Sequence, residues 1–343
     1  MPRMMCYSRV IACWALLAAL GPATPATIED LERPHQIDGL NSSPQLTRSC
    51  ESSTNINGTL FQNPEYPSVT TTPICACKLK VYLVNKNICQ IRLDFIDFSL
   101  AQPNREGVCE QDFLQVTGGV TNIPLICGNN SGQHLYMDVI PGSRSVNITV
   151  HTSTAGAKWN ISVTQIKCNA VNRAPAGCLQ YFTNTFGTIK SFNSPYDANP
   201  DLINTAPMAT TQLANQTYSV CIKSQSGFCS IAYRKTSGVT NDYSFSLSGD
   251  PAARPIGTIG SVGSTDCTTD YLIIPNGIIT DVSYPAITSD RYCGVNFPSK
   301  VESQVQPFVL YVVTDETETN HADTVLNDGG NAGFSISYRI QPC

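Results

Sequence analysis

The chain has 343 residues, enough for two ordinary domains, with a formal net charge of −5 and only 14% charged residues. No run of Lys or Arg occurs, which argues against nucleic acid or an anionic membrane surface as the partner, because both are bound through clustered cations.

The N-terminal segment 1–26 has the features of a signal peptide. Arg3 and Arg9 precede an apolar stretch over residues 10–20, and small residues and prolines then lead to Ala26. A bilayer needs about 20 apolar residues, so this stretch is too short to span one. We therefore expect a mature protein that is secreted, extracellular and without a membrane span.

Residues 27–49 are polar, carry prolines and show no apolar period, so we expect a loose N-terminal leader there. From residue 50 onward the chain alternates apolar and polar residues, as in residues 89–100, 145–153 and 159–166. This period of two, rich in Val, Ile and Thr, predicts β-strands, and helical periodicity is nearly absent. The sequence therefore predicts an all-β fold.

Residues 50–168 recur as residues 178–343, and residues 169–177 form a short linker with Ala, Pro and Gly. The clearest match places "CEQDFLQVTGG" (109–119) over "CTTDYLIIPNG" (267–277). The chain thus reads as two tandem copies of one β domain.

The second copy is longer than the first at residues 249–265 and 315–331. Loops added to a rigid sheet scaffold commonly carry binding function, so we expect the partner surface at these two insertions.

The chain has 15 cysteines, of which Cys6 and Cys13 lie in the signal peptide. The remainder indicates an oxidising compartment and about six disulfide bonds. Six cysteines of one copy align with six of the other, but six cysteines allow about 15 pairings, so spacing alone does not choose among them. Equal bonds in both copies, with close pairs joined, give the prediction Cys77–Cys89, Cys109–Cys127, Cys50–Cys168, Cys221–Cys229, Cys267–Cys293 and Cys178–Cys343.

Cys75 is the odd cysteine, two residues before Cys77. It would compete with Cys77 for one partner, stay buried and unpaired, or form an intermolecular disulfide. A zinc site is disfavoured because paired cysteines do not supply the four ligands that zinc needs. Sequons for N-glycosylation behind the signal peptide predict a glycoprotein, with acceptors at Asn41, Asn57, Asn129, Asn147, Asn160 and Asn215.

Several motifs occur in the same order in both copies. The first copy has "FIDFSL", "CEQDFL" and "LICG", and the second has "YSFSL", "CTTDYL" and "YCG". In this order they resemble the CUB domain, and phrases such as "TTDYLIIPNG" are similar to secreted tandem-CUB proteins of arthropods, most of them uncharacterised. The resemblance implies a jelly-roll-like antiparallel β-sandwich for each copy, with which the alternating strands agree.

Many CUB domains bind calcium through three acidic positions. In the first copy the resemblance leaves only Asp112, because Ala101 occupies the first position and His151 and Ser153 the last. Calcium takes six or more oxygen ligands, including several carboxylates, so one carboxylate does not hold it. We expect Asp112 to cap a turn instead.

The second copy keeps two of these positions, Asp270 and Asp315, and Asp250 and Glu316 lie close enough in the sequence to assist. These residues are the candidate metal ligands, and calcium in the second copy is the one cofactor that the sequence suggests. The alternative is a capped turn beside a solvated acidic loop.

No pattern typical of an enzyme is present, neither a nucleophile elbow nor a trypsin-like stretch. The four histidines are scattered, without metal-ligand spacing: His35, His134, His151 and His321. We therefore predict a non-enzymatic, disulfide-bonded module that binds an extracellular protein or glycan. The alternatives are a structural matrix component cross-linked through Cys75 and, more remotely, a hydrolase.

Overall fold

The protein is described here from a computed structural model. The structure describes residues 45–195, 211–235, 244–247, 261–280, 286–294, 297–316 and 331–343. Within this part, Leu46–Cys343 form one compact unit, and every regular element is a β-strand. No helix in these ranges has the length and apolar character needed to cross a membrane.

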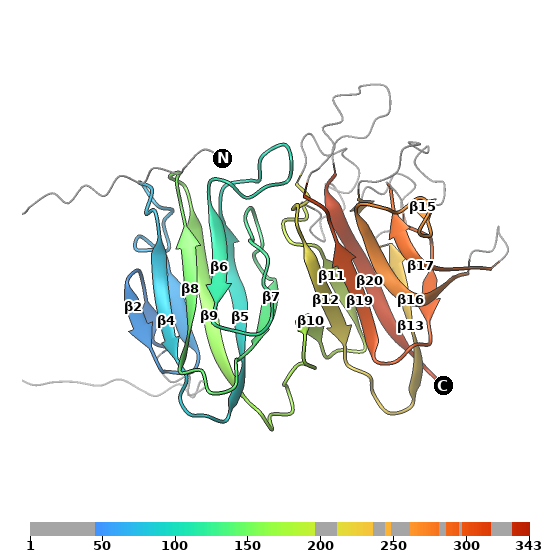
Figure 1. The fold of residues 1–343 in the computed structure, drawn as a ribbon, viewed down its shortest axis with the longest axis horizontal. Coiled ribbons are helices and arrows are strands. Elements are labelled where there is room, and N and C mark those ends of the chain that lie inside the picture. Colours follow the sequence, from blue (N-terminus) through green and yellow to red (C-terminus); the bar gives the residue numbers. More distant parts are fainter. Residues whose placement is uncertain are drawn as a thin grey trace, which may run out of the picture. The chain divides into compact units, whose positions relative to one another are not determined.

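The strands of the first half form a sandwich of two sheets (Figure 1). The five-stranded sheet has the order β1 (Thr47–Arg48), β3 (Thr59–Gln62), β9 (Lys158–Lys167), β5 (Ile88–Ser99) and β7 (His134–Asp138). The four-stranded sheet has the order β2 (Ser52–Thr54), β4 (Cys77–Tyr82), β8 (Ser145–His151) and β6 (Phe113–Thr117).

The strands of the second half repeat this order, joined into one hydrogen-bonded path. The path is β10 (Cys178–Phe182), β12 (Thr217–Ile222), β19 (Phe308–Val313), β16 (Tyr271–Ile279), β18 (Val301–Ser303), β13 (Phe228–Lys235), β20 (Gly333–Pro342) and β11 (Phe186–Lys190). Three further strands attach beside it: β14 (Phe245–Ser246) on β20, and β15 (Ser261–Val262) through β17 (Ile287–Cys293) on β16.

The two orders match strand for strand. β2-β4-β8-β6 corresponds to β10-β12-β19-β16, and β7-β5-β9-β3 corresponds to β18-β13-β20-β11. The chain is therefore all-β, with two tandem sandwiches of one topology, as the sequence predicts. The exact domain boundaries, 50–168 and 178–343, stay a prediction.

The alternation of β4 shows why these segments form half-buried strands. Cys77, Leu79 and Val81 are fully buried between the sheets, whereas Lys78 and Tyr82 face outward. Burying one such aliphatic side chain contributes about 1.5–3 kcal/mol, so the period of two fixes which face of the strand turns inward.

The disulfide bonds correct the sequence prediction. Two predicted bonds are present, Cys109–Cys127 and Cys267–Cys293. The other four are wrong, namely Cys77–Cys89, Cys50–Cys168, Cys221–Cys229 and Cys178–Cys343. In their place the structure has Cys50–Cys77, Cys89–Cys168, Cys178–Cys221 and Cys229–Cys343.

The reason lies in the sheet arrangement. Cys77 on β4 and Cys89 on β5 are close in sequence but belong to opposite sheets. Cys50 precedes β2, the parallel neighbour of β4, and its Cα lies 4.4 Å from that of Cys77. Cys168 follows β9, the neighbour of β5. Each of these bonds therefore ties two adjacent strands of one sheet, and the second sandwich repeats the scheme.

Cys75 is disulfide-bonded in the structure. The twelve cysteines that align between the two copies pair among themselves, so the prediction that Cys75 is the odd cysteine of the mature chain stays a prediction.

The predicted glycan acceptors differ in accessibility. Three are exposed, Asn57, Asn129 and Asn215, and Asn147 is half-buried. Asn160 is only 6% exposed, and its Nδ2 donates a hydrogen bond of 3.3 Å to the hydroxyl of Tyr66. A glycan does not fit this buried amide in the folded chain. Asn41 lies outside the described residues.

Candidate functional site

The carboxylate of Asp112 ties together three loops of the first sandwich. Its Oδ1 accepts hydrogen bonds from the backbone N–H groups of Ser153 (2.9 Å) and Thr154 (3.2 Å). Its Oδ2 accepts from the N–H of Ala101 (3.2 Å) and the hydroxyl of Thr154 (2.9 Å). Both oxygens of this buried side chain are thus satisfied by the protein, which is the turn-tying role that the sequence predicts.

Asp270 occupies the corresponding place at the start of β16 and is also fully buried. Its Oδ1 accepts a hydrogen bond of 2.9 Å from the backbone N–H of Asp315. Its Oδ2 has no hydrogen-bond partner in the described structure. Burial, and secondarily the negative charge of Asp315, raises the pKa of Asp270 to about 7.

A cation would compensate this orphaned carboxylate oxygen, whereas both oxygens of Asp112 are already satisfied by the protein. Asp315 is half-buried beside it and Glu316 is exposed, while Asp250 lies outside the described residues. The described residues contain no group of three or more potential ligand side chains from His, Cys, Asp and Glu. Because calcium takes 6–8 oxygens, backbone carbonyls and water would have to complete its shell.

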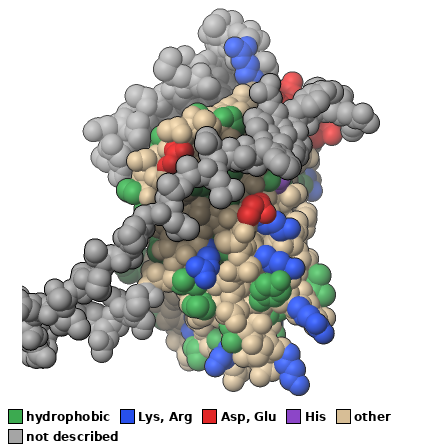
Figure 2. Space-filling model, turned by 90° about the vertical axis from the view of Figure 1, so that its left-hand side faces the viewer, with side chains coloured by type: hydrophobic (Ala, Val, Ile, Leu, Met, Phe, Trp, Pro, Cys, Tyr) green, Lys and Arg blue, Asp and Glu red, His purple; other side chains and the backbone are tan. Residues whose placement is uncertain are grey.

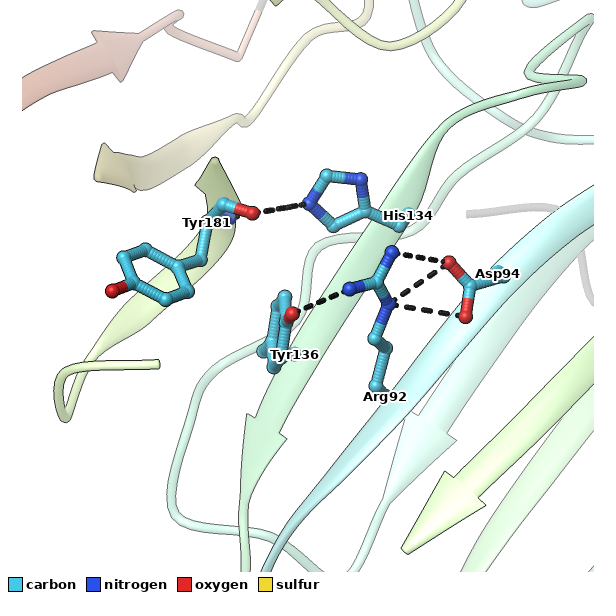
Figure 3. Close-up of polar contacts among 5 residues, drawn as sticks. All are labelled: Arg92, Asp94, His134, Tyr136 and Tyr181. Carbon is cyan, nitrogen blue, oxygen red and sulfur yellow. Dashed lines mark hydrogen bonds and ion pairs between the residues drawn. The ribbon is translucent and has the colours of Figure 1, made fainter. Parts of the chain in front are cut away.

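A second polar cluster lies where the two sandwiches meet (Figure 3). The imidazole of His134, on β7, points at the backbone of Tyr181 on β10. Its Nε2 lies 3.1 Å from the carbonyl oxygen of Tyr181 and 3.2 Å from the amide nitrogen. A neutral imidazole satisfies one of these two groups at a time, by donating or accepting according to its tautomer.

Arg92 and its partners lie beside this histidine. The guanidinium binds Asp94 at 2.6 Å and donates to the hydroxyl of Tyr136 at 2.7 Å. It also lies 5.2 Å from the centre of the Tyr136 ring (Figure 3). Burial, and secondarily the charge of Arg92, lowers the pKa of His134 to about 4. The sequence gives His134 no metal-ligand spacing and no sign of this contact between the two sandwiches, called the joint below.

The linker is tied into the same joint. Gln90 is fully buried; its Nε2 donates to the carbonyl of Ala174 (2.9 Å), and its Oε1 accepts from the N–H of Ala174 (2.9 Å). Gln90 also donates to Asp138, which in turn accepts from the N–H of Gly177. The short linker is therefore a fixed part of the joint rather than a tether.

Asn193 makes a third set of contacts across the joint. Its N–H donates to Asn130 Oδ1 (2.7 Å), its Oδ1 accepts from the N–H of Asn129 (2.8 Å), and its Nδ2 donates to Gln102 (2.9 Å). A Cβ on Gly128 would lie 2.0 Å from Asn193 Oδ1, and Gly128 has a φ of +74°. Only glycine leaves room for Asn193 at this position, so the glycine of the Cys-Gly motif is the sequence feature that indicates this contact.

The remaining predicted features give no further site. His151 stacks on Phe113 with ring centres 4.6 Å apart, and His35 and His321 lie outside the described residues. The insertions that we expected to carry the partner surface fall largely outside as well, over residues 249–260 and 317–330.

Comparison with family models identifies a known domain in the second half of the chain. Residues 175–341 match the family model of the animal CUB domain. The second sandwich is an animal CUB domain. The first sandwich has the same strand order and disulfide scheme, so the two form a tandem CUB-like pair. A search of curated proteins returns no match.

Among solved structures, the chain is similar to the CUB1-EGF-CUB2 domains of rat MASP-1, with 14% identity over 84% of this chain and 100% of that one, at a TM-score of 0.28. It is similar to the corresponding domains of human MASP-1/3, with 15% identity over 82% and 98%, at 0.26. It is similar to the MASP-1 CUB2 domain bound to Ca²⁺, with 18% identity over 34% and 98%, at 0.28.

Proposed function

We propose that the protein is a secreted, glycosylated, non-enzymatic binding module whose second CUB domain recognises an extracellular protein or glycan with the help of calcium. CUB domains generally mediate protein interactions and are non-catalytic. The observation that carries the proposal is the buried Asp270 carboxylate, one oxygen of which has no partner in the described structure. An uncompensated buried charge is unfavourable, and such groups concentrate at functional sites.

Asp270, just before β16, and Asp315 and Glu316, in the loop after β19, would hold the ion; the further sequence candidate Asp250 lies outside the described residues. Bound calcium would supply positive charge that fixes the loop after β19 against the start of β16. That loop leads into one of the two insertions on which we expect the partner to bind.

Two alternatives compete with this proposal. Cross-linking of a matrix component through Cys75 stays an alternative, and a non-reducing gel tests it: a covalent dimer that Cys75→Ser abolishes would favour it. A hydrolase requires a nucleophile with an adjacent base, and the described histidines are engaged with Tyr181 and Phe113 instead.

The test uses the full secreted chain and follows calcium by isothermal titration and by thermal unfolding. We expect calcium to raise the melting temperature of the wild type, because a ligand that binds only the folded state stabilises it. Asp270→Asn should abolish the heat of binding and the shift. Asp112→Asn is the matched control: it should lower the melting temperature and leave the calcium response intact.

A wild-type melting temperature that calcium does not change would contradict the calcium part of the proposal. Equal calcium responses in the wild type and Asp270→Asn would place the ion elsewhere. Serine-hydrolase labelling of the secreted protein would contradict its non-enzymatic character.

A further inference from the structure

One end of the first sandwich gathers cations from chain segments that are far apart in the sequence. The segments are the turn at 55–58, the β4–β5 loop at 83–87, the β7–β8 loop at 140–144 and the chain after β9 at 168–173. These segments carry Lys86, Arg144 and Arg173, and the adjoining strands add Lys80 on β4 and Lys167 at the end of β9. None of these five forms an ion pair among the described residues.

Acidic side chains are missing from the sequence that builds this end. Residues 52–64, 77–93 and 139–176 contain no Asp or Glu. The neighbouring carboxylate, Asp138, accepts hydrogen bonds from Gln90 and Gly177 in the joint. In a chain with a net charge of −5, this end is therefore locally positive.

The same loops expose large apolar side chains. Tyr82 is 43% exposed, Val84 53%, Ile56 50%, Ile140 44% and Val171 87%. Lys80 Nζ lies 5.0 Å from the centre of the Tyr82 ring, so cation and aromatic surface adjoin. Figure 2 shows Lys and Arg gathered with hydrophobic side chains in the lower half of the visible face, and the visible Asp and Glu above them.

Hydrogen bonds hold these loops in one fixed surface. The side chain of Gln165 accepts from the N–H of Val84 (2.9 Å) and donates to the carbonyls of Tyr82 (3.2 Å) and Asn55 (3.4 Å). The N–H of Leu83 donates to the carbonyl of Arg144 (3.0 Å). A preformed surface loses little conformational freedom on binding, which favours recognition over non-specific attraction.

We propose that this basic apolar end, defined by Ile56, Tyr82, Val84, Lys86 and Arg144, is a docking surface for an acidic segment of a protein partner that also presents an apolar anchor. Charge complementarity supplies the first element of recognition, and the exposed Tyr82 and Val84 supply the second. This surface is separate from the calcium site and does not depend on it.

The chemistry of the loops distinguishes a protein from a membrane. The apolar side chains alternate with amide side chains, including Asn55, Asn85, Asn87 and Asn172. Immersing unpaired amides in hydrocarbon is unfavourable, whereas a peptide pairs with them through its own backbone. A sulfated glycan would use the cations but not the apolar side chains.

The experiment measures binding of a fluorescent peptide of alternating Glu, Asp, Leu and Phe to the full secreted chain in the presence of EDTA, so that calcium plays no part. The comparison probe replaces each Glu and Asp by Gln and Asn. Lys86→Glu combined with Arg144→Glu, and separately Tyr82→Ser combined with Val84→Ser, should each weaken binding roughly tenfold or more, about 1.4 kcal/mol. Arg234→Glu combined with Arg339→Glu, on the second sandwich, is the matched charge control and should leave binding unchanged.

Further measurements distinguish a protein partner from a sulfated glycan and from an anionic membrane. Immobilised heparin and phosphatidylserine vesicles are offered to the same variants, with and without enzymatic removal of N-glycans, because Asn57 lies at this end. The proposal is supported if the acidic peptide binds, if both variant pairs weaken that binding, and if the amide peptide does not bind. No peptide binding by the deglycosylated wild type, equal binding by the variants, or preference for heparin or vesicles over the peptide would overturn it.

Discussion

Asp112 and Asp270 occupy equivalent positions in the two sandwiches, yet the first carboxylate accepts four hydrogen bonds and the second accepts one. The same residue at the same place in the fold is therefore a structural tie in one copy and an incompletely satisfied anion in the other. Both aspartates lie three residues after a cysteine, so the local sequence does not distinguish them. The difference in hydrogen bonding comes from the loop that faces each carboxylate.

Asp112→Ala should destabilise the first sandwich by about 3 kcal/mol, because it removes the acceptor for the N–H groups of Ala101 and Thr154 and for the Thr154 hydroxyl. Urea unfolding followed by tryptophan fluorescence measures this loss, since Trp159 is buried in the same sandwich. The loss should be the same with calcium and with EDTA. A loss that appears only with calcium would mean that Asp112 acts as a ligand.

The joint at His134 should weaken on acidification. The pKa of His134 is about 4 in the folded chain against an ordinary 6.5, so its contribution to stability is fully present above pH 6.5 and is lost as the pH falls towards 4. At 1.36 kcal/mol per pKa unit the loss is at most about 3 kcal/mol. Urea unfolding at pH 7.5 and at pH 4.5 gives the difference, and His134→Gln should reduce it. An unchanged pH dependence in this variant would contradict the assignment.

Gln90→Leu should release the linker. The substitution removes both hydrogen bonds to Ala174 and leaves its N–H and carbonyl unpaired, at a cost of about 2–4 kcal/mol. Limited proteolysis should then cut within residues 169–177 faster than in the wild type. Gln115→Leu, on the exposed face of β6, is the control and should leave the cleavage rate unchanged.

Non-reducing peptide mapping should recover Cys50–Cys77 and Cys89–Cys168 in the first sandwich. A Cys77–Cys89 peptide would contradict the observed sheet arrangement. The Cys89–Cys168 bond closes a loop with a sequence separation of 79. Replacing both of its cysteines by Ser should lower the free energy of unfolding by about 4–5 kcal/mol.

Intact-mass measurement should find no glycan on Asn160, since its amide is buried against Tyr66. Asn160→Gln should leave the glycan mass unchanged, whereas Asn57→Gln should remove one glycan. A glycan at Asn160 would contradict this prediction, because it would show that the side-chain amide of Asn160 is accessible.

Local patterns predict the strands of this fold, because burial of alternate residues, as in Leu79 and Val81, is written directly into the sequence. The internal repeat predicts the duplicated topology in the same way. The cysteine pairing was predictable only in part: the period of two does not reveal which strands are neighbours within a sheet, and that relationship decides the partner of Cys77.

The sites depend on contacts between distant segments and were harder to predict. His134 and Tyr181 are separated by 47 residues, and neither has a sequence context that marks it as part of a joint. The basic apolar end was not predicted from the sequence, because its cations are spaced singly along the chain. They come together only when the chain folds. Asp270 was predictable from the family pattern, whereas its orphaned oxygen was not.

The joint covers a strand edge that would be exposed in a fragment of the chain. β7 and β10 each lie at the end of a strand path, so each would offer an open row of backbone donors and acceptors to other chains. In the folded protein the side chains of the first sandwich, His134 among them, occupy that position on β10. The first sandwich therefore shields the edge of β10 from self-association at Tyr181, and a fragment cut at the linker would expose this edge.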